Sequence, residues 1–169
     1  MKFSVLIPVF NEEKTVIEVL KRLNSTKVDE VDYEVIVIND GSTDKTKELL
    51  EQNRNLFSKL INNERNSGKG FSVKEGLKVA SGDYIIFQDA DLEYDPIEFK
   101  KFIKVCRQFD ADLILGSRFI YSEYTRSHNI LNKIGRSNLP CGCLTAFFPS
   151  HQRQPNKNIF GSGIKWKMM

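Results

Sequence analysis

Two aspartates, Asp89 and Asp91, are the residues whose types and spacing most directly suggest chemistry in this chain. They follow the apolar run Tyr-Ile-Ile-Phe at residues 84–87, and Glu93 lies two positions beyond the second aspartate. Carboxylates this close together repel one another and resist desolvation, so a counter-cation is expected. A divalent metal that carries a phosphorylated ligand meets this need. A solvated acidic turn is the alternative interpretation of the same three residues.

The apolar run before these aspartates is typical of a buried strand in a parallel sheet. Further strands are predicted from comparable runs at residues 3–10, 33–38, 56–61 and 112–116. Helices are predicted between them, on faces with helical spacing at residues 16–23, 46–53, 70–80 and 99–106. Strands and helices thus alternate for about 118 residues. This order predicts an α/β fold whose mostly parallel central sheet has helices on both faces.

Polar clusters follow the predicted strands at the point where each strand ends. They occupy residues 8–12, 39–44, 89–93 and 116–118. Parallel strands bring their carboxyl ends to one edge of a sheet, and ligands bind at that edge. We therefore expect the four clusters to form one ligand site.

Two segments, at residues 39–44 and 66–70, resemble nucleotide contacts, although neither is specific by itself. Asp40 follows a predicted strand and offers a carboxylate to a base or ribose, while Gly41 permits a tight turn. A helix-capping turn without a ligand explains the same residues. The segment Asn-Ser-Gly-Lys-Gly at residues 66–70 opens a predicted helix with two glycines and a cation, as phosphate-binding segments do. It lacks the spacing of a Walker A loop, and no Gly-x-Gly-x-x-Gly follows the first strand.

Composition indicates an ordinary protein of 169 residues, with 40% hydrophobic and 28% charged residues. No apolar run approaches the roughly 18 residues of a membrane span, and the amino-terminal segment does not resemble a secretory signal. Three cysteines without paired metal-ligand spacing favour a reducing cytoplasm over a disulfide framework.

The charge of the chain is distributed unevenly. Residues 1–118 hold 18 Lys and Arg against 21 Asp and Glu, whereas residues 119–169 hold 7 against 1. A basic tail of this kind suits phosphate, an anionic membrane surface, nucleic acid or simply solvent. Charge alone does not choose among them.

Five motifs together resemble those of family 2 glycosyltransferases, in particular the dolichol- or undecaprenyl-phosphate mannosyl- or glucosyltransferase branch. They are Pro-Val-Phe-Asn-Glu at residues 8–12, Asn-Asp-Gly-Ser-Thr-Asp at 39–44, Asn-Ser-Gly-Lys-Gly at 66–70, Asp-Ala-Asp at 89–91 and Gly-Ser-Arg at 116–118. The resemblance covers residues 3 to about 136. It implies a GT-A fold, which is a Rossmann-like α/β/α sandwich, with a nucleotide-sugar donor, Mg²⁺ or Mn²⁺, and inversion at the anomeric carbon.

The resemblance also assigns roles to single residues. Those that would bind the donor nucleotide are Pro8, Asn11, Glu12, Asp40, Asn66, Gly68 and Gly70. Asp89 would contact the ribose or the metal, Asp91 would be the main metal ligand and a catalytic residue, and Glu93 would be a further ligand. Arg118 would neutralise a phosphate of donor or acceptor during catalysis. Arg126 is either a second such cation or an ordinary surface arginine.

The chain departs from the family pattern in two places. Asn39 replaces the first aspartate of the commoner Asp-Asp-Gly-Ser form. After Arg136 the pattern is lost, and Pro140 would break the amphipathic helix expected there. We therefore expect a glycosyltransferase domain at residues 1–136, and an irregular basic tail, with disorder as an open alternative, at residues 137–169. The acceptor half looks incomplete, as in a truncated or frame-altered gene or a donor-binding remnant.

The function implied is transfer of a hexose from UDP-glucose, GDP-mannose or a similar donor to a polyprenyl phosphate or glycan. The expected partners include no nucleic acid, and the expected place is the cytoplasm, with peripheral association at the cytoplasmic face of a membrane. An inactive nucleotide-sugar-binding remnant is the main alternative. A nucleotidyltransferase is disfavoured, because no loop rich in glycine, lysine and arginine follows the first strand.

Overall fold

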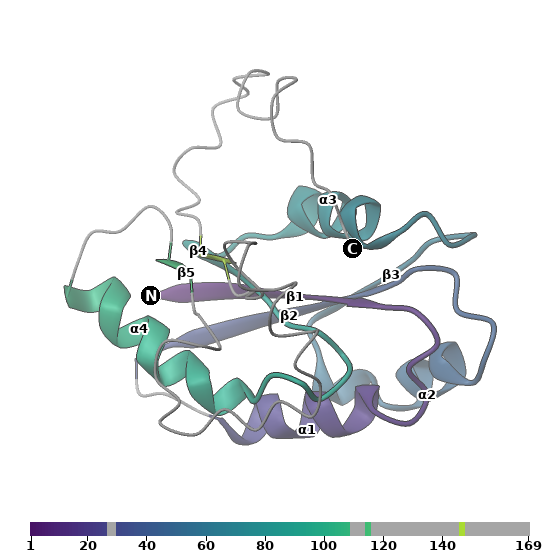
Figure 1. The fold of residues 1–169 in the computed structure, drawn as a ribbon, viewed down its shortest axis with the longest axis horizontal. Coiled ribbons are helices and arrows are strands. Elements are labelled where there is room, and N and C mark those ends of the chain that lie inside the picture. Colours follow the sequence, from purple (N-terminus) through teal and green to yellow (C-terminus); the bar gives the residue numbers. More distant parts are fainter. Residues whose placement is uncertain (27–29, 109–113, 116–145, 148–169) are drawn as a thin grey trace, which may run out of the picture.

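The computed structural model describes residues 1–26, 30–108, 114–115 and 146–147. A four-stranded parallel sheet lies at the centre, with the strand order β3-β2-β1-β4 (Figure 1). The strands are β1 (Lys2–Val9), β2 (Asp32–Asn39), β3 (Lys59–Asn62) and β4 (Tyr84–Phe87). The predicted parallel sheet is therefore confirmed.

Helices follow the strands and cover both faces of this sheet. They are α1 (Val16–Ser25), α2 (Thr46–Gln52), α3 (Lys69–Val79) and α4 (Phe99–Gln108), with short 3₁₀ turns η1 (Arg54–Leu56) and η2 (Pro96–Glu98). Figure 1 shows α1, α2 and α4 on one face of the sheet and α3 on the other. Among the described residues, no helix combines the length and the apolar character that crossing a membrane requires.

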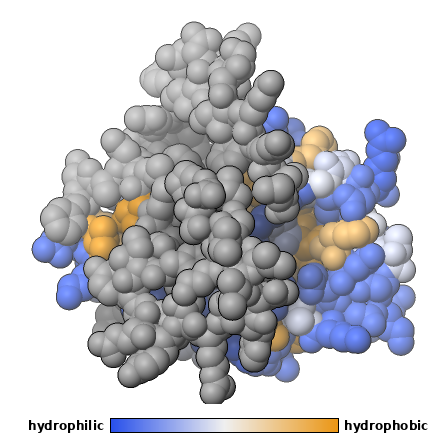
Figure 2. Space-filling model, in the orientation of Figure 1, coloured by the Kyte–Doolittle hydropathy of each residue, from blue (hydrophilic) through white to orange (hydrophobic). Residues whose placement is uncertain are grey.

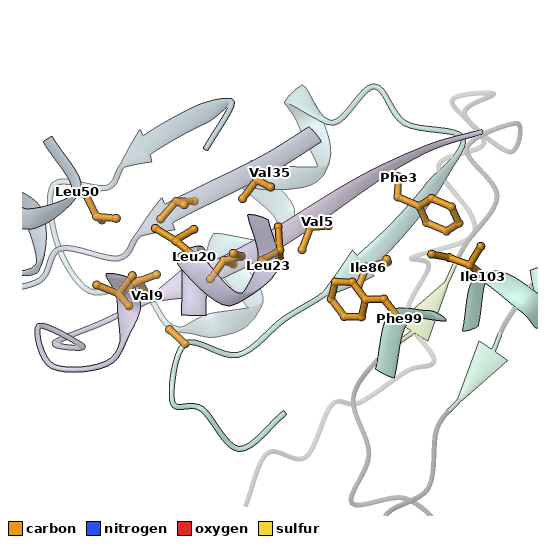
Figure 3. Packing of buried hydrophobic residues seen from close by; sticks show 14 of the residues in the cluster. Phe3, Val5, Val9, Leu20, Leu23, Val35, Leu50, Ile86, Phe99 and Ile103 are labelled. Atoms are coloured by element: carbon orange, nitrogen blue, oxygen red, sulfur yellow. The ribbon is translucent and has the colours of Figure 1, made fainter. Parts of the chain in front are cut away.

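The larger part of the core lies between the sheet and α1, α2 and α4 (Figure 3). Alternation along β1 sends Phe3, Val5 and Val9 to this face, where they meet Leu20 of α1 and Phe99 of α4. Each of these five side chains is at most 2% exposed. Burial of this apolar area stabilises the packing of α1 and α4 on the sheet.

The second face of the sheet packs against α3 through small residues. The buried residues of α3 are Ser72 and Gly76, whereas Gly70, which belonged to the predicted apolar face, is exposed. A Cβ atom on Gly76 would lie 3.0 Å from Cδ1 of Ile38 and 3.2 Å from Cδ2 of Leu6. Two predicted residues of the face are confirmed, since Ala80 is buried in the cluster on this side and Leu77 packs against it. The face was therefore predicted only in part, because the close approach of α3 at Gly76 selects a residue without a side chain.

Two predicted strands differ in the structure. Residues 54–56 form η1, and β3 begins only at Lys59. The predicted strand at residues 112–116 is described only at β5 (Ile114–Leu115), which pairs antiparallel with β6 (Ala146–Phe147) in a separate two-stranded sheet. The strand β6 falls inside the range expected to be irregular. The remainder of residues 137–169 lies outside the described part of the chain, so the predicted boundary at residue 136 stays a prediction.

Candidate functional site

The carboxyl ends of β1, β2 and β3 lie level with one another. Val9 is opposite Asn39, which in turn is opposite Asn62. Backbone pairing continues past the strands, because the Asp40 amide donates to the Val9 carbonyl at 2.8 Å and the Asn63 amide donates to the Asn39 carbonyl at 2.9 Å. In Figure 2, which has the orientation of Figure 1, the described surface at the right, where β1 ends, is mostly hydrophilic. The predicted polar clusters after β1 and β2 therefore meet at one edge, whereas the predicted cluster at residues 116–118 lies outside the described residues.

The loop after β1 is bonded to the loop after β2. The Asn11 amide donates to Oγ of Ser42 at 3.0 Å, and the Thr43 amide donates to Oδ1 of Asn11 at 2.8 Å. Asn11 has a φ of 55°, a left-handed conformation that asparagine tolerates well. One residue further along, the Glu12 amide donates to Oγ1 of Thr46 at 2.9 Å. Asn11 and Glu12 thus fix the relative position of two loops at the candidate site.

Asp44 adds a further connection between these loops. Its carboxylate accepts from the Thr46 amide at 3.0 Å and from the Glu13 amide at 3.2 Å. Burial opposes ionisation of Asp44, but the hydrogen bonds from Thr46 and Glu13 outweigh it and lower the pKa of this carboxyl. Asp44 is therefore a structural acid of the site.

Asp40 connects β2 to the loop that precedes α3. Its side chain belongs to a residue only 3% exposed, and its oxygens accept from Nδ2 of Asn63 at 2.7 Å, from the Gly68 amide at 2.7 Å and from the Ser67 amide at 3.2 Å. Burial opposes ionisation of Asp40, but these hydrogen bonds, with Ser72 in addition, lower its pKa overall. Asp40 thus holds the loop after β3 as an ionised anchor, and its contact with a nucleotide stays a prediction.

Gly41 allows two loop backbones to come into contact. Its φ is 68°, a region that only glycine enters without strain. A Cβ atom at this position would lie 2.5 Å from the carbonyl carbon of Arg65 and 2.6 Å from the amide nitrogen of Asn66. Glycine is therefore required here for both conformation and space, which confirms the predicted tight turn.

Asn39 uses both halves of its side-chain amide. Its Nδ2 donates to Oδ1 of Asn62 at 2.9 Å, while its Oδ1 accepts from the Ser42 amide at 3.1 Å. Asn62 is at the end of β3, and Ser42 is in the loop after β2. An aspartate carboxylate would keep the second bond but has no hydrogen to donate in the first. The departure from the commoner sequence is thus matched by a specific contact.

The residues after β4 form a loop, residues 88–95, that we call the acidic loop. Within it, Oδ1 of Asp89 accepts from the ammonium group of Lys69 at the start of α3. Asp91 is exposed, and its Oδ1 accepts from the Glu93 amide at 3.0 Å. Among the described residues, no group of three His, Cys, Asp or Glu side chains is arranged to hold a metal ion. The metal role of Glu93 therefore stays a prediction.

Two carboxylates are nevertheless a donor set that suits Mg²⁺ or Mn²⁺. Magnesium usually binds through one or two carboxylates, with substrate phosphates and water completing its shell. Asp89, with a side chain 23% exposed, and the exposed Asp91 match this requirement in chemistry and access. The residues present thus fit a divalent metal that arrives with a diphosphate.

The other predicted donor residues occupy the same edge. Pro8 is half-buried in β1 opposite Ile38. Oδ1 of Asn66 accepts from the Gly68 amide at 3.0 Å, and Gly68 has a φ of 88°. Gly70 is exposed in the first turn of α3. The predicted residues Arg118 and Arg126 lie outside the described residues.

Sequence reasoning missed two residues at this edge. Phe10 was assigned to a strand, but it lies beyond β1 and is 41% exposed. It offers an aromatic face on which a base stacks readily. Gln88, buried directly before Asp89, was not assigned any role. A signal for Phe10 was available, since this residue lies within the polar cluster and the motif at residues 8–12.

Comparison with known sequences gives a consistent result. The family model described as "Glycosyl transferase family 2" matches residues 4–159. A dolichol-phosphate mannosyltransferase of Pyrococcus furiosus is 32% identical over 71% of this chain and 34% of its own length. An undecaprenyl-phosphate 4-deoxy-4-formamido-L-arabinose transferase of Photorhabdus laumondii is 32% identical over 89% of this chain and 50% of its own length. The chain thus spans between a third and half of these curated relatives.

Comparison with solved structures identifies similar folds. S. aureus TarS 1-349 in complex with UDP-GlcNAc superposes with a TM-score of 0.64 and 27% identity, over 88% of this chain and 45% of that protein. A second similar structure is glucosyl-3-phosphoglycerate synthase from Mycobacterium tuberculosis, in complex with Mn²⁺, UDP and glucosyl-3-phosphoglycerate. It superposes with a TM-score of 0.52 and 26% identity, over 62% of this chain and 39% of that protein. The fold is that of the GT-A glycosyltransferases. With its motifs, fold and family match in agreement, this chain belongs to glycosyl transferase family 2.

Proposed function

We propose that this chain binds a nucleotide-diphosphate sugar together with Mg²⁺ or Mn²⁺ and transfers the hexose, with inversion, to a polyprenyl phosphate or a glycan. One observation carries the proposal: the loops after all four parallel strands meet at one edge and are bonded to one another. Lys69, the first residue of α3, directly follows the third of these loops, and its bond to Asp89 connects it to the fourth. The similar structure of TarS contains UDP-GlcNAc, and that of glucosyl-3-phosphoglycerate synthase contains UDP and Mn²⁺. These ligands support the proposed class of donor.

The reaction requires stabilisation of charge on the leaving diphosphate. When the glycosidic bond breaks, negative charge develops on the diphosphate while the sugar becomes oxocarbenium-like. A bound divalent metal supplies positive charge to the diphosphate, and Asp89 and Asp91 are the residues proposed to hold it. Lys69 adds a cation at the same place, and Arg118 is proposed as a further one. The catalytic roles thus fall on Asp91 and Arg118.

The acceptor decides whether a general base is needed. A glycan hydroxyl must lose a proton as it attacks, which calls for a base. A polyprenyl phosphate is already anionic near neutral pH, because the second pKa of such phosphates is about 6. Relatives are named as transferases for dolichol phosphate and undecaprenyl phosphate, which supports the lipid acceptor. This acceptor would bring the chain to the cytoplasmic face of a membrane as a peripheral protein.

Donor binding and sugar transfer are separable tests. The chain is incubated with radiolabelled UDP-glucose or GDP-mannose, Mn²⁺ and polyprenyl phosphate, and labelled lipid and free sugar are measured. Transfer supports the enzyme. Donor binding without transfer or hydrolysis favours the alternative, an inactive nucleotide-sugar-binding remnant.

The site assignment is tested by Asp91→Ala with Asp32→Ala as its matched control. Asp32 is an exposed carboxylate at the opposite, amino-terminal edge of the sheet. We expect Asp91→Ala to abolish the Mn²⁺-dependent part of UDP or GDP binding, measured by calorimetry, and Asp32→Ala to leave it unchanged. Unchanged Mn²⁺-dependent binding in Asp91→Ala would show that the metal assignment is wrong.

A further inference from the structure

We infer that Gln88 is a positioning residue for Asp89 and Asp91, because its side-chain amide holds the two ends of the acidic loop in place. The inference rests on the proposed function, since it concerns the carboxylates assigned to the metal. Gln88 itself is only 1% exposed. It therefore acts through the loop backbone rather than by touching a substrate.

The contacts of Gln88 join residues at opposite ends of the loop. Its Nε2 donates to the Asp89 carbonyl at 3.0 Å and to the Tyr94 carbonyl at 3.0 Å. Its backbone amide donates to the Leu6 carbonyl at 3.0 Å, which fixes Gln88 to β1. One side chain anchored to the sheet thus uses both of its amide hydrogens to hold the backbone around the two aspartates.

The other half of the Gln88 amide argues against a role in stability alone. Among the described residues, its buried Oε1 has no hydrogen-bond partner, and a buried unpaired acceptor destabilises a fold. The amide cannot rotate to improve this, because the Asp89 and Tyr94 carbonyls accept hydrogen bonds only from its nitrogen. An apolar side chain would occupy the same buried place without that cost. The glutamine is explained by what its nitrogen does for the loop.

The loop needs such support because its backbone sets the position of the carboxylates. Leu92 has a φ of 64°, a left-handed conformation that is unfavourable for a non-glycine residue. Ala90, between the two aspartates, is buried in the core. Asp91 is exposed, so core packing does not fix its side chain. Backbone anchors at Gln88 and Ala90 therefore determine where the metal-binding oxygens lie.

The test compares Gln88→Met, which keeps the length but removes both amide hydrogens, with Ile103→Val. Ile103 is a core residue of α4 that is 1% exposed, and its shortening mildly destabilises the core without altering a residue of the acidic loop. We expect Gln88→Met to weaken Mn²⁺-dependent binding of UDP or GDP at least about tenfold, as loss of outer contacts does at metal sites. Binding of uridine or guanosine without metal should not change. Ile103→Val should alter neither.

Two results would overturn the inference. One is Mn²⁺-dependent binding that is unchanged in Gln88→Met, and the other is a loss of equal factor in nucleoside binding without metal, which would indicate general loosening. Amide exchange at Glu93, measured by NMR without any ligand, gives an independent readout because this amide donates to Asp91. We expect faster exchange in Gln88→Met only, and unchanged exchange would also refute the role.

The same experiments separate failure of this inference from failure of the proposed function. If the unaltered chain binds neither UDP nor GDP with Mn²⁺, the proposed function fails, and amide exchange at Glu93 alone decides whether Gln88 holds the loop. If the unaltered chain binds the Mn²⁺–nucleotide and Gln88→Met binds it equally well, the function stands and the inference on Gln88 fails.

Discussion

The ammonium group of Lys69 donates a hydrogen bond to Asp89, so the first residue of α3 is ion-paired with the acidic loop after β4. The two side chains are 38% and 23% exposed, which leaves the pair accessible from solvent. A divalent cation that binds Asp89 must compete with this ammonium group, because both are attracted by the same carboxylate. If the proposed function holds, a diphosphate that arrives with the metal provides Lys69 with a new anionic partner.

We predict opposite effects of Lys69→Met on metal and on nucleotide. Without the ammonium, Mn²⁺ alone should bind about fivefold more tightly, since one charge at a partly exposed site is worth about 1 kcal/mol. The Mn²⁺–UDP or Mn²⁺–GDP complex should bind more weakly, because the diphosphate loses a cation. Electron paramagnetic resonance measures the first affinity and calorimetry measures the second.

Lys74→Met is the matched control for this prediction, because Lys74 is an exposed lysine one turn further along α3. It should leave both affinities unchanged at physiological salt. If Lys69→Met and Lys74→Met behave alike, the ion pair with Asp89 has no part in metal or donor binding.

We predict that Asp40→Asn destabilises the fold by about 2–4 kcal/mol, because an amide cannot accept from Asn63, Ser67 and Gly68 as an ionised carboxylate does. Urea unfolding measures this loss. Asp32→Asn, at an exposed carboxylate on the opposite edge, should change the free energy of unfolding by less than about 0.5 kcal/mol. Equal stability of the two variants would contradict the anchoring role of Asp40.

The common position of the polar clusters was predictable, because it follows from the alternation of strands and helices. In parallel sheets, residues that follow strands must share an edge, so Asn11, Asp40 and Asp89 were expected there together. Their partners were not predictable. Asp40 bonds to Gly68, and Lys69 bonds to Asp89, across 28 and 20 residues of sequence. No periodicity encodes such separations.

Residues that act through burial were also beyond the sequence pattern. Gln88 lies between an apolar strand and two aspartates, so the sequence does not indicate whether its side chain is buried or exposed. Only the structure shows that it is buried, with its nitrogen on two carbonyls. Gly76 was similarly invisible, because the absence of a side chain gives no apolar signal, although it is what lets α3 approach Ile38.

Gly41→Ala and Gly70→Ala form a matched pair at two glycines of the site. In Gly41→Ala, the new Cβ would lie 2.5 Å from the Arg65 backbone at a φ of 68°. We therefore expect the free energy of unfolding to fall by at least about 2 kcal/mol. At Gly70 no atom of the described residues, apart from its chain neighbours and its own helix backbone, lies within 4 Å of a new Cβ. Alanine favours a helix by up to about 1 kcal/mol. Thermal unfolding checks both, and a destabilised Gly70→Ala would contradict the described geometry.

Gly70→Ala also tests the proposed donor site, because the fold of this variant should be intact. Weaker binding of UDP or GDP by a Gly70→Ala protein of unchanged or higher melting temperature would place the nucleotide against Gly70. Unchanged binding would exclude a close contact there, whereas the same measurement on Gly41→Ala would confound donor contact with loss of structure.

A buried acid at the opposite edge of the sheet links three strands to the segment that follows α3. Glu34 of β2 is 6% exposed. Its carboxylate accepts from Oγ of Ser4 at 2.6 Å, from Nζ of Lys59 at 2.8 Å and from the Ser81 amide at 2.7 Å. Ser4, Lys59 and Ser81 belong to β1, to β3 and to the segment between α3 and β4. This network stabilises the framework without taking part in the site.

The Glu34 network should make stability depend on acid pH. Burial opposes ionisation, but the bonds from Lys59, Ser4 and Ser81 outweigh it and lower the pKa of Glu34 from 4.5 to about 2. Because the folded-state pKa is the lower one, the stabilisation is complete above 4.5 and is lost as pH falls towards 2. Glu34→Gln should therefore cost on the order of 3 kcal/mol near pH 7, and the difference from the unaltered protein should shrink steadily below pH 4.5 in urea unfolding. The control is Glu18→Gln, which breaks an exposed pair with Arg22 and should lower the free energy of unfolding by less than about 0.5 kcal/mol at every pH. A loss of stability in Glu34→Gln that did not vary with pH would show that the ionised carboxylate is not what stabilises the fold.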